Sequence, residues 1–206
     1  MRRIVADEAG IADAAATIRA GGVVAIPTDT LYGLAADPFN RVAVARVFDV
    51  KGRRAERALP LIAADAAQVV RRLGPLPAAA ERLASEFWPG PLTLLIDARG
   101  AVPAEVTGGT GRVGVRVPAH DVTRALCVAC ESLLTATSAN LSEQPATNDP
   151  DAVAAALGDR IDVLLDAGKT TGGPPSTIVD ASGSTLRLVR AGAVAWEQVL
   201  ACVQRA

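Results

Sequence analysis

The sequence predicts an α/β protein with a twisted sheet of mixed parallel and antiparallel strands flanked by helices, in a single domain covering residues 1–206. Short β-branched, apolar runs alternate along the chain with segments whose apolar residues recur at helical spacing. Two pairs of strands, within 92–117 and 176–190, are close enough in sequence to be antiparallel neighbours. Several strands also open into polar loops, which is where α/β proteins place their sites.

Each expected helix has apolar residues at helical spacing, and most have a capping side chain before them or a Gly or Pro after them. They are 11–20, 40–50, 65–73, a helix ending near Trp88, 121–130, a helix starting at Asp149 and Pro150, and 196–204. Each expected strand is a short apolar run rich in β-branched residues. They are 23–26, 59–63, 92–97, 113–117, 133–137, 163–166, 176–180 and 186–190.

Composition limits the class of protein. No run of about 18 apolar residues occurs, so no membrane-spanning helix is expected, and the N-terminus lacks the apolar segment of a signal peptide. A cytoplasmic protein is therefore expected. Three cysteines cannot form a paired framework. Cys127 and Cys130 are expected to be buried helix thiols, because a structural zinc needs four ligands.

The stretch Val23–Leu34 contains the first candidate site. Its apolar run stops at Pro27, and Thr28, Asp29 and Thr30 follow directly. Hydroxyls and a carboxylate at a strand end are placed to meet a ligand. The alternative is that these threonines only cap backbone groups, which is an ordinary role for them.

Two further clusters carry charge or polar groups. The segment 51–57 contains one lysine and three arginines against a single glutamate, although the net charge of the chain is only −1. Such a cluster holds an anion locally, or is a solvated surface. Ser138 and Asn140 follow the strand 133–137, and they are either hydrogen-bond donors of a site or members of a plain turn.

Taken together, the motifs resemble those of the YrdC/Sua5 family. PTDTLYGL at 27–34 resembles the family signature. The other matching elements occur in family order: K-x-R at 51–53, W-P-G-P-L-T at 88–93, V-R-x-P at 115–118, S-x-N at 138–140, and closing motifs at 176–180 and 189–192. Accidental agreement of so many ordered elements is implausible.

The resemblance implies a YrdC-like fold in its short, single-domain form. The implied activity is that of an L-threonylcarbamoyladenylate synthase, a nucleotidyltransferase that forms threonylcarbamoyl-AMP and pyrophosphate from L-threonine, bicarbonate or CO2, and ATP. Mg²⁺ is expected to accompany ATP. The product would serve the N6-threonylcarbamoyladenosine (t6A) modification of tRNA through partner proteins, and contact with tRNA or double-stranded RNA is a further expectation.

The resemblance also implies roles for particular residues. Lys51 and Arg53 are expected to be catalytic, because fixed cations stabilise the charge that develops on pyrophosphate. ATP is expected to contact six residues: Lys51, Arg53, Arg57, Ser138, Asn140 and Arg190. Threonine is expected to contact Thr30, Arg116 and Ser176, with the arginine on its carboxylate. No protein ligands for a resident metal are predicted.

The sequence departs from the family pattern at three places. Arg54 stands where the family commonly has proline, Arg112 where it often has a hydroxyl residue, and no histidine follows Leu61 and Ile62. Two alternatives therefore remain open. The chain is a related family member that adenylates another carbamate, or it is a module that binds double-stranded RNA without catalysis.

Overall fold

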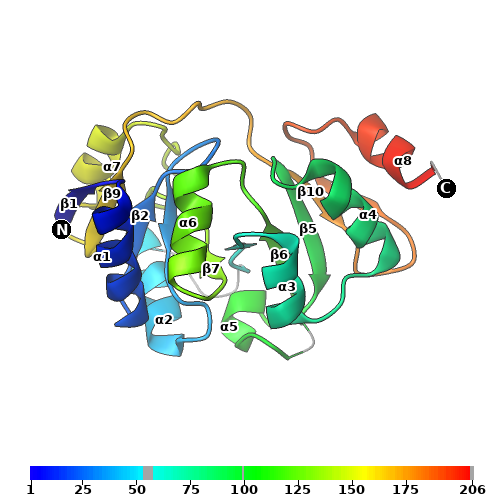
Figure 1. The fold of residues 1–206 in the computed structure, drawn as a ribbon, viewed down its shortest axis with the longest axis horizontal. Helices are drawn as coiled ribbons and strands as arrows, with labels where there is room; N and C mark the ends of the chain where they lie inside the picture. The colour runs from blue at the N-terminus through cyan, green and yellow to red at the C-terminus, as the bar shows by residue number, and fades with distance from the viewer. Residues whose placement is uncertain (53–57, 99, 205–206) are drawn as a thin grey trace.

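A computed structural model describes residues 1–52, 58–98 and 100–204 and contains two sheets side by side (Figure 1). The first holds β1 (Arg2–Val5), β9 (Val163–Asp166), β2 (Val24–Ile26), β3 (Gly33–Ala35) and β8 (Thr137–Ser138), in that order. The second holds β11 (Arg187–Arg190), β10 (Thr177–Asp180), β5 (Leu92–Asp97), β6 (Arg112–Arg116), β4 (Leu61–Ile62) and β7 (Leu134–Thr135).

The predicted mixture of strand directions is confirmed. β5 and β6 are antiparallel, as are β10 and β11, whereas β10 runs parallel to β5 and β1 runs parallel to β9. The strands form two sheets rather than one continuous sheet, and the strand expected at 133–137 is divided between them at Ala136. β7 pairs with β4 in one sheet and β8 pairs with β3 in the other. The chain therefore passes from one sheet to the other at Ala136, directly before the strand that ends at Ser138.

The helices flank these sheets (Figure 1). They are α1 (Glu8–Arg19), α2 (Arg41–Lys51), α3 (Ala66–Leu73), α4 (Ala78–Phe87), α5 (Ala104–Thr107), α6 (Asp121–Ala129), α7 (Pro150–Leu157) and α8 (Trp196–Gln204). Asn40 caps α2, since its Oδ1 accepts from the amides of Val42 at 3.0 Å and Ala43 at 3.2 Å. Gly52 ends α2 with a φ of 62°, a conformation that suits glycine.

Three elements escaped the sequence prediction: β1, β3 and α5. β1 contains two arginines and lies at the edge of its sheet, where Arg3 pairs with Asp166 at 2.7 Å. β3 contains glycine and alanine, which are both depleted in strands. Its antiparallel pairing with Val24–Ile26 of β2 stabilises the strand despite this weak local preference.

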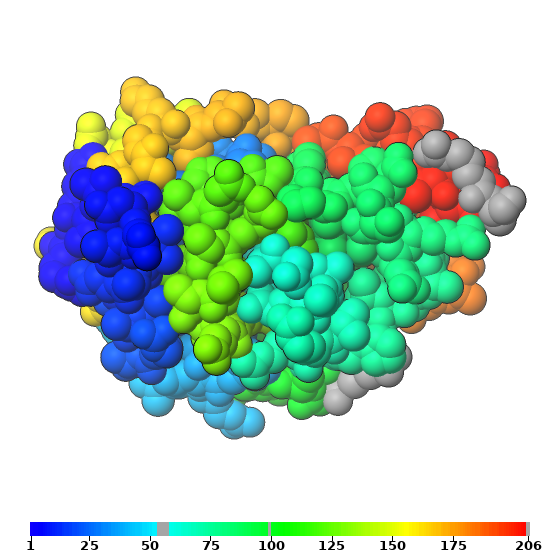
Figure 2. All heavy atoms as spheres, viewed as in Figure 1, coloured from blue at the N-terminus to red at the C-terminus, as the bar shows by residue number. Residues whose placement is uncertain are grey.

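The apolar interior consists of two clusters, one of which contains Val23, Tyr32 and Leu94, while the other contains Ile18 and Ile26. In the space-filling view, α1, α6, α3 and α4 form one continuous face (Figure 2). Among the described residues, every helix is too short or too polar to cross a bilayer.

Candidate functional site

The long connection from β9 to β10 crosses from one sheet to the other (Figure 1). Its anchor is the backbone of Thr30, whose carbonyl accepts from the Oγ1 of Thr170 at 2.7 Å and from the amide of Gly172 at 2.9 Å. The hydroxyl of Thr30 lies 3.2 Å from that of Thr28, which also donates to the carbonyl of Leu31 at 2.6 Å. The two threonines therefore organise the signature loop as well as presenting hydroxyls.

The Lys51 ammonium joins the end of α2 to the loop after β8. It donates to the carbonyl of Ser138 at 2.6 Å, and to the carbonyl and the Oδ1 of Asn140 at 2.9 Å each. The Ser138 hydroxyl in turn donates to the Asn140 Oδ1 at 2.6 Å. Lys51 is only 3% exposed. Its charge is therefore surrounded by oxygen acceptors of this loop.

Arg116 ends β6 with a buried guanidinium. Its Nε donates to the carbonyl of Gly90 at 2.8 Å, and its Nη2 donates to the carboxylate of Asp29. The two side chains are 10% and 13% exposed. Burial lowers the pKa of Arg116 from its ordinary value, and the Asp29 carboxylate opposes that shift. A guanidinium stays charged even when its pKa falls somewhat, so Arg116 remains a cation suited to a carboxylate ligand.

Ser176 and Arg190 meet at the start of β10. Arg190 Nη2 donates to the Ser176 carbonyl at 2.7 Å and to its hydroxyl at 3.1 Å. The hydroxyls of Ser176 and Thr93 are 2.8 Å apart. Burial lowers the pKa of Arg190. Gly192 permits this packing, because a Cβ there would lie 2.3 Å from the Pro175 carbonyl.

A cavity of about 480 Å³ brings several of these groups together. Its lining includes four of the predicted residues, Arg116, Ser138, Ser176 and Arg190. Lys51 and Asn140 lie directly behind Ser138 rather than on the wall. The predicted Arg53 and Arg57, like Arg54, lie outside the described residues. The cavity therefore combines two arginines with hydroxyls from both sheets.

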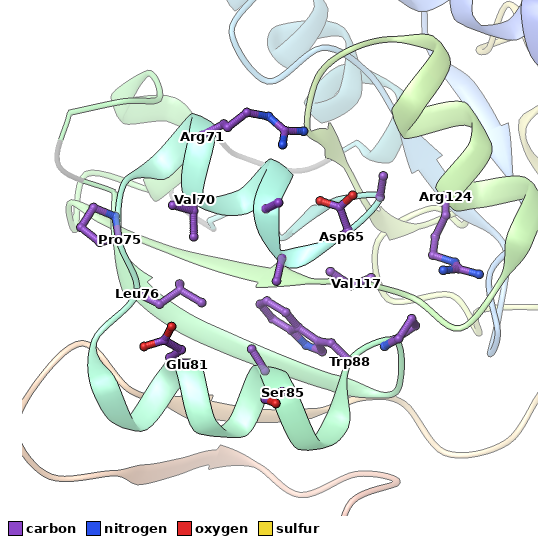
Figure 3. Close-up of a pocket in the computed structure, with 15 residues that line it drawn as sticks. Asp65, Val70, Arg71, Pro75, Leu76, Glu81, Ser85, Trp88, Val117 and Arg124 are labelled. Atoms are coloured by element: carbon purple, nitrogen blue, oxygen red, sulfur yellow. The ribbon is translucent and has the colours of Figure 1, made fainter.

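A second cavity, of about 830 Å³, lies between α3 and α4 and holds none of the predicted site residues (Figure 3). Trp88, Leu76 and Val70 give it apolar walls, and Asp65 and Arg124 lie at one end (Figure 3). Volume alone would favour this cavity as the site. The smaller cavity is the better candidate, because its cations and hydroxyls converge from the motif-bearing loops.

Comparison with known proteins adds an independent observation. The Sua5/YciO/YrdC family model, described as telomere recombination, matches residues 16–192. The chain belongs to the Sua5/YciO/YrdC family. The threonylcarbamoyl-AMP synthase of Halorhodospira halophila is 44% identical to it over 152 residues, which are 74% of this chain and 80% of that protein.

A curated sequence and a crystal structure from Pyrococcus abyssi are also similar to this chain. A threonylcarbamoyl-AMP synthase is 38% identical over 186 residues, which are 90% of this chain and 55% of that protein. The crystal structure of Sua5 complexed with L-threonine matches with a TM-score of 0.92 and 36% identity, over 98% of this chain and 60% of that one. The chain thus spans little more than half the length of these two relatives.

For this Sua5/YciO/YrdC chain, sequence reasoning missed one residue of the site, Thr93, and one contact, the ion pair between Asp29 and Arg116. Thr93 lines the cavity and pairs with Ser176, but its position inside a strand concealed it. Its presence in the motif at 88–93 was the available signal. Asp29 was noticed only as part of the signature. Its ion pair with Arg116 joins residues 87 positions apart, which local sequence cannot reveal.

The two helix thiols are buried, as predicted. Cys127 lies in α6 and Cys130 directly follows it. Burial raises the pKa of Cys127 well above the usual range and that of Cys130 to about 11. Both thiols are therefore protonated near neutral pH, which makes them unreactive.

Proposed function

We propose that this chain forms threonylcarbamoyl-AMP and pyrophosphate from L-threonine, bicarbonate or CO2, and ATP, and that the product serves the t6A modification of tRNA. The supporting observation is the cavity where Arg116, Ser176 and Arg190 converge beside the loop held by Lys51. A cationic, hydroxyl-rich hollow suits a carboxylate and phosphates together. The relatives named threonylcarbamoyl-AMP synthase support the same reaction.

The reaction has two bond-forming steps. The threonine amine adds to the carbon of CO2, forming an N–C bond and releasing a proton to solvent. A carbamate oxygen then attacks the α-phosphorus of ATP, forming an O–P bond while the bond to the bridging oxygen breaks and pyrophosphate leaves. Negative charge moves onto the departing group, so fixed cations contribute most of the catalysis.

The proposal assigns the threonine carboxylate to Arg116 and its remaining polar groups to Thr30 and Ser176. The phosphates are assigned to Lys51, Arg53, Arg57 and Arg190, with Ser138 and Asn140 as hydrogen-bonding partners. Lys51 and Arg53 are the proposed catalytic cations. These assignments rest on the family motifs. Of the assigned residues that the structure describes, Arg116, Ser138, Ser176 and Arg190 line the cavity, whereas Thr30, Lys51 and Asn140 do not.

ATP is proposed to enter as its magnesium complex. Mg²⁺ commonly binds substrate phosphates together with one or two carboxylates. Among the described residues, no group of three His, Cys, Asp or Glu side chains is arranged around a common point. The ion is therefore assigned to ATP. Transfer to tRNA by partner proteins, with direct RNA contact, would take place in the cytoplasm and is part of the same proposal.

Pyrophosphate release tests this proposal. The purified chain is incubated with ATP and bicarbonate, and with L-threonine, L-serine or L-2-aminobutyrate in turn. Threonine should give the fastest release. Serine lacks one methyl group, which is worth about 10- to 200-fold in a fitted pocket, and 2-aminobutyrate should be rejected more strongly because it leaves buried polar groups unpaired.

The same assay distinguishes the alternatives. Release that does not depend on threonine contradicts the proposal, and faster release with another amine indicates a sibling enzyme. RNA binding that weakens steeply with salt, without any ATP consumption, would indicate the binding module instead.

A further inference from the structure

Among the described residues, the Asp29 carboxylate makes no hydrogen bond within its own loop. An aspartate in a turn usually accepts from a backbone amide two residues further on. Among the described residues, the amide two residues on, that of Leu31, makes no hydrogen bond to Asp29, and the amide of Thr30 donates to the hydroxyl of Thr28. Within the described part of the chain, the buried Oδ1 of Asp29 accepts no hydrogen bond, and its Oδ2 accepts from Arg116.

The buried ion pair between Asp29 and Arg116 is not expected to stabilise the fold appreciably. Removing two charges from water costs free energy that their attraction often fails to recover, so a buried pair is weak evidence for stability. Both side chains are nevertheless close to nine-tenths buried. The burial of this pair is explained if the Arg116 guanidinium has to be charged at this position and held in one orientation.

The contacts of Arg116 define that orientation. Gly90 holds Nε from the turn after α4, and Asp29 holds Nη2 from the signature loop. Among the described residues no acceptor is bonded to Nη1, while Arg116 itself lines the 480 Å³ cavity. Two fixed contacts on one side of a planar guanidinium leave the remaining donors for a ligand.

We propose that Asp29 is the positioning residue of the amino-acid site: it fixes the Arg116 guanidinium so that its remaining donors meet the substrate carboxylate. The inference rests on the proposed function, which assigns that carboxylate to Arg116. Asp29 itself does not take part in the chemistry.

The test compares Asp29→Ala, Asp29→Asn and Asp29→Glu with wild type. Threonine and ATP are titrated separately, so that KM for each and kcat are obtained. Loss of a charge-assisted hydrogen bond predicts a rise in threonine KM of about 10- to 100-fold for the Ala and Asn variants. The KM for ATP should stay within about twofold, and the Glu variant should recover most of the threonine affinity. General damage to the fold would raise both KM values.

A matched control is Asp13→Ala, which removes a carboxylate that pairs with Arg2 at the surface. This variant should leave both KM values unchanged. The double variant Asp29→Ala, Arg116→Ala measures the coupling between the two residues. If Asp29 acts through Arg116, the threonine KM of the double variant should be no higher than that of Arg116→Ala alone. Additive effects would overturn the inference.

A measurement on the protein without substrate tests the positioning role of Asp29 separately from the proposed function. In ¹⁵N spectra of the arginine side chains, Arg116 should give separate signals for its two Nη groups, because the ion pair slows rotation of the guanidinium. These signals should merge in Asp29→Asn. Unchanged signals would refute the positioning role, whereas a wild-type protein that releases no pyrophosphate would refute the proposed function instead.

Discussion

Replacing Lys51 with methionine probes the centre of the site, because the substitution keeps the length of the side chain and removes its charge. Three oxygens lie 2.6–2.9 Å from the ammonium. The Ser138 carbonyl also accepts from the Asn140 amide at 2.9 Å, and the Asn140 Oδ1 also accepts from the Ser138 hydroxyl. Among the described residues, only the Asn140 carbonyl is left without a donor.

One buried, unpaired carbonyl costs about 1–3 kcal/mol of stability. The variant also avoids the free-energy cost of burying the Lys51 charge. The expected loss of stability is therefore about 1–3 kcal/mol. For a chain of this size this loss corresponds to a fall in Tm of about 2–12 °C. The activity should fall much further, by about 100-fold or more in kcat, because a fixed positive charge behind the loop that is proposed to bind the phosphates is removed.

The assay is threonine-dependent pyrophosphate release at least 15 °C below the Tm of the variant, with unfolding followed by circular dichroism. Lys169 is the chain's only other lysine and supplies the control. Its ammonium lies 2.9 Å from Asp149, but its side chain is 71% exposed, so Lys169→Met should leave the stability almost unchanged. Wild-type kcat in Lys51→Met would refute the proposed role of this cation.

Three further predictions concern other parts of the chain. Ser176→Ala should raise the threonine KM more than the ATP KM, measured in the same assay, and equal effects on both would argue against a threonine contact. Burial would raise the pKa of Asp180, but hydrogen bonds from Ser182 and Arg187 and the charge of Arg112 lower it to about 2. The stabilisation of wild type over Asp180→Asn in urea should therefore be complete above about pH 4 and disappear as the pH falls toward 2; a constant difference would contradict this assignment. Cys127 should react with a thiol reagent at pH 8 only after unfolding, and rapid reaction of the native protein would show that it is accessible.

The boundaries of most elements followed from local sequence. The strands at 92–97 and 163–166 and the helix at 196–204 have the predicted limits. In each of them the apolar pattern agrees with the final environment. The split of 133–137 into β7 and β8 did not follow, because it depends on which partner strand lies next to each half. Pairing between distant strands is not encoded in a local pattern.

In the site as well, the residue types followed from local sequence, whereas their long-range contacts did not. The loop motifs led to Arg116, Ser138, Ser176 and Arg190, which line one cavity. They did not indicate that Lys51 would be enclosed by backbone oxygens, since that depends on how α2 meets the loop after β8. The partner of Asp29 was equally inaccessible. Residue types that carry chemistry are visible in the sequence, whereas the contacts that orient them arise from the fold.

Detection of the product itself tests the central claim most directly. The purified chain is mixed with ATP, L-threonine and ¹³C-bicarbonate, and the adenylates are separated and weighed by mass spectrometry. We expect an adduct of AMP and threonine that carries a single ¹³C atom and appears together with an equal amount of pyrophosphate. Consumption of ATP without that labelled adduct, or no consumption at all, would contradict the account.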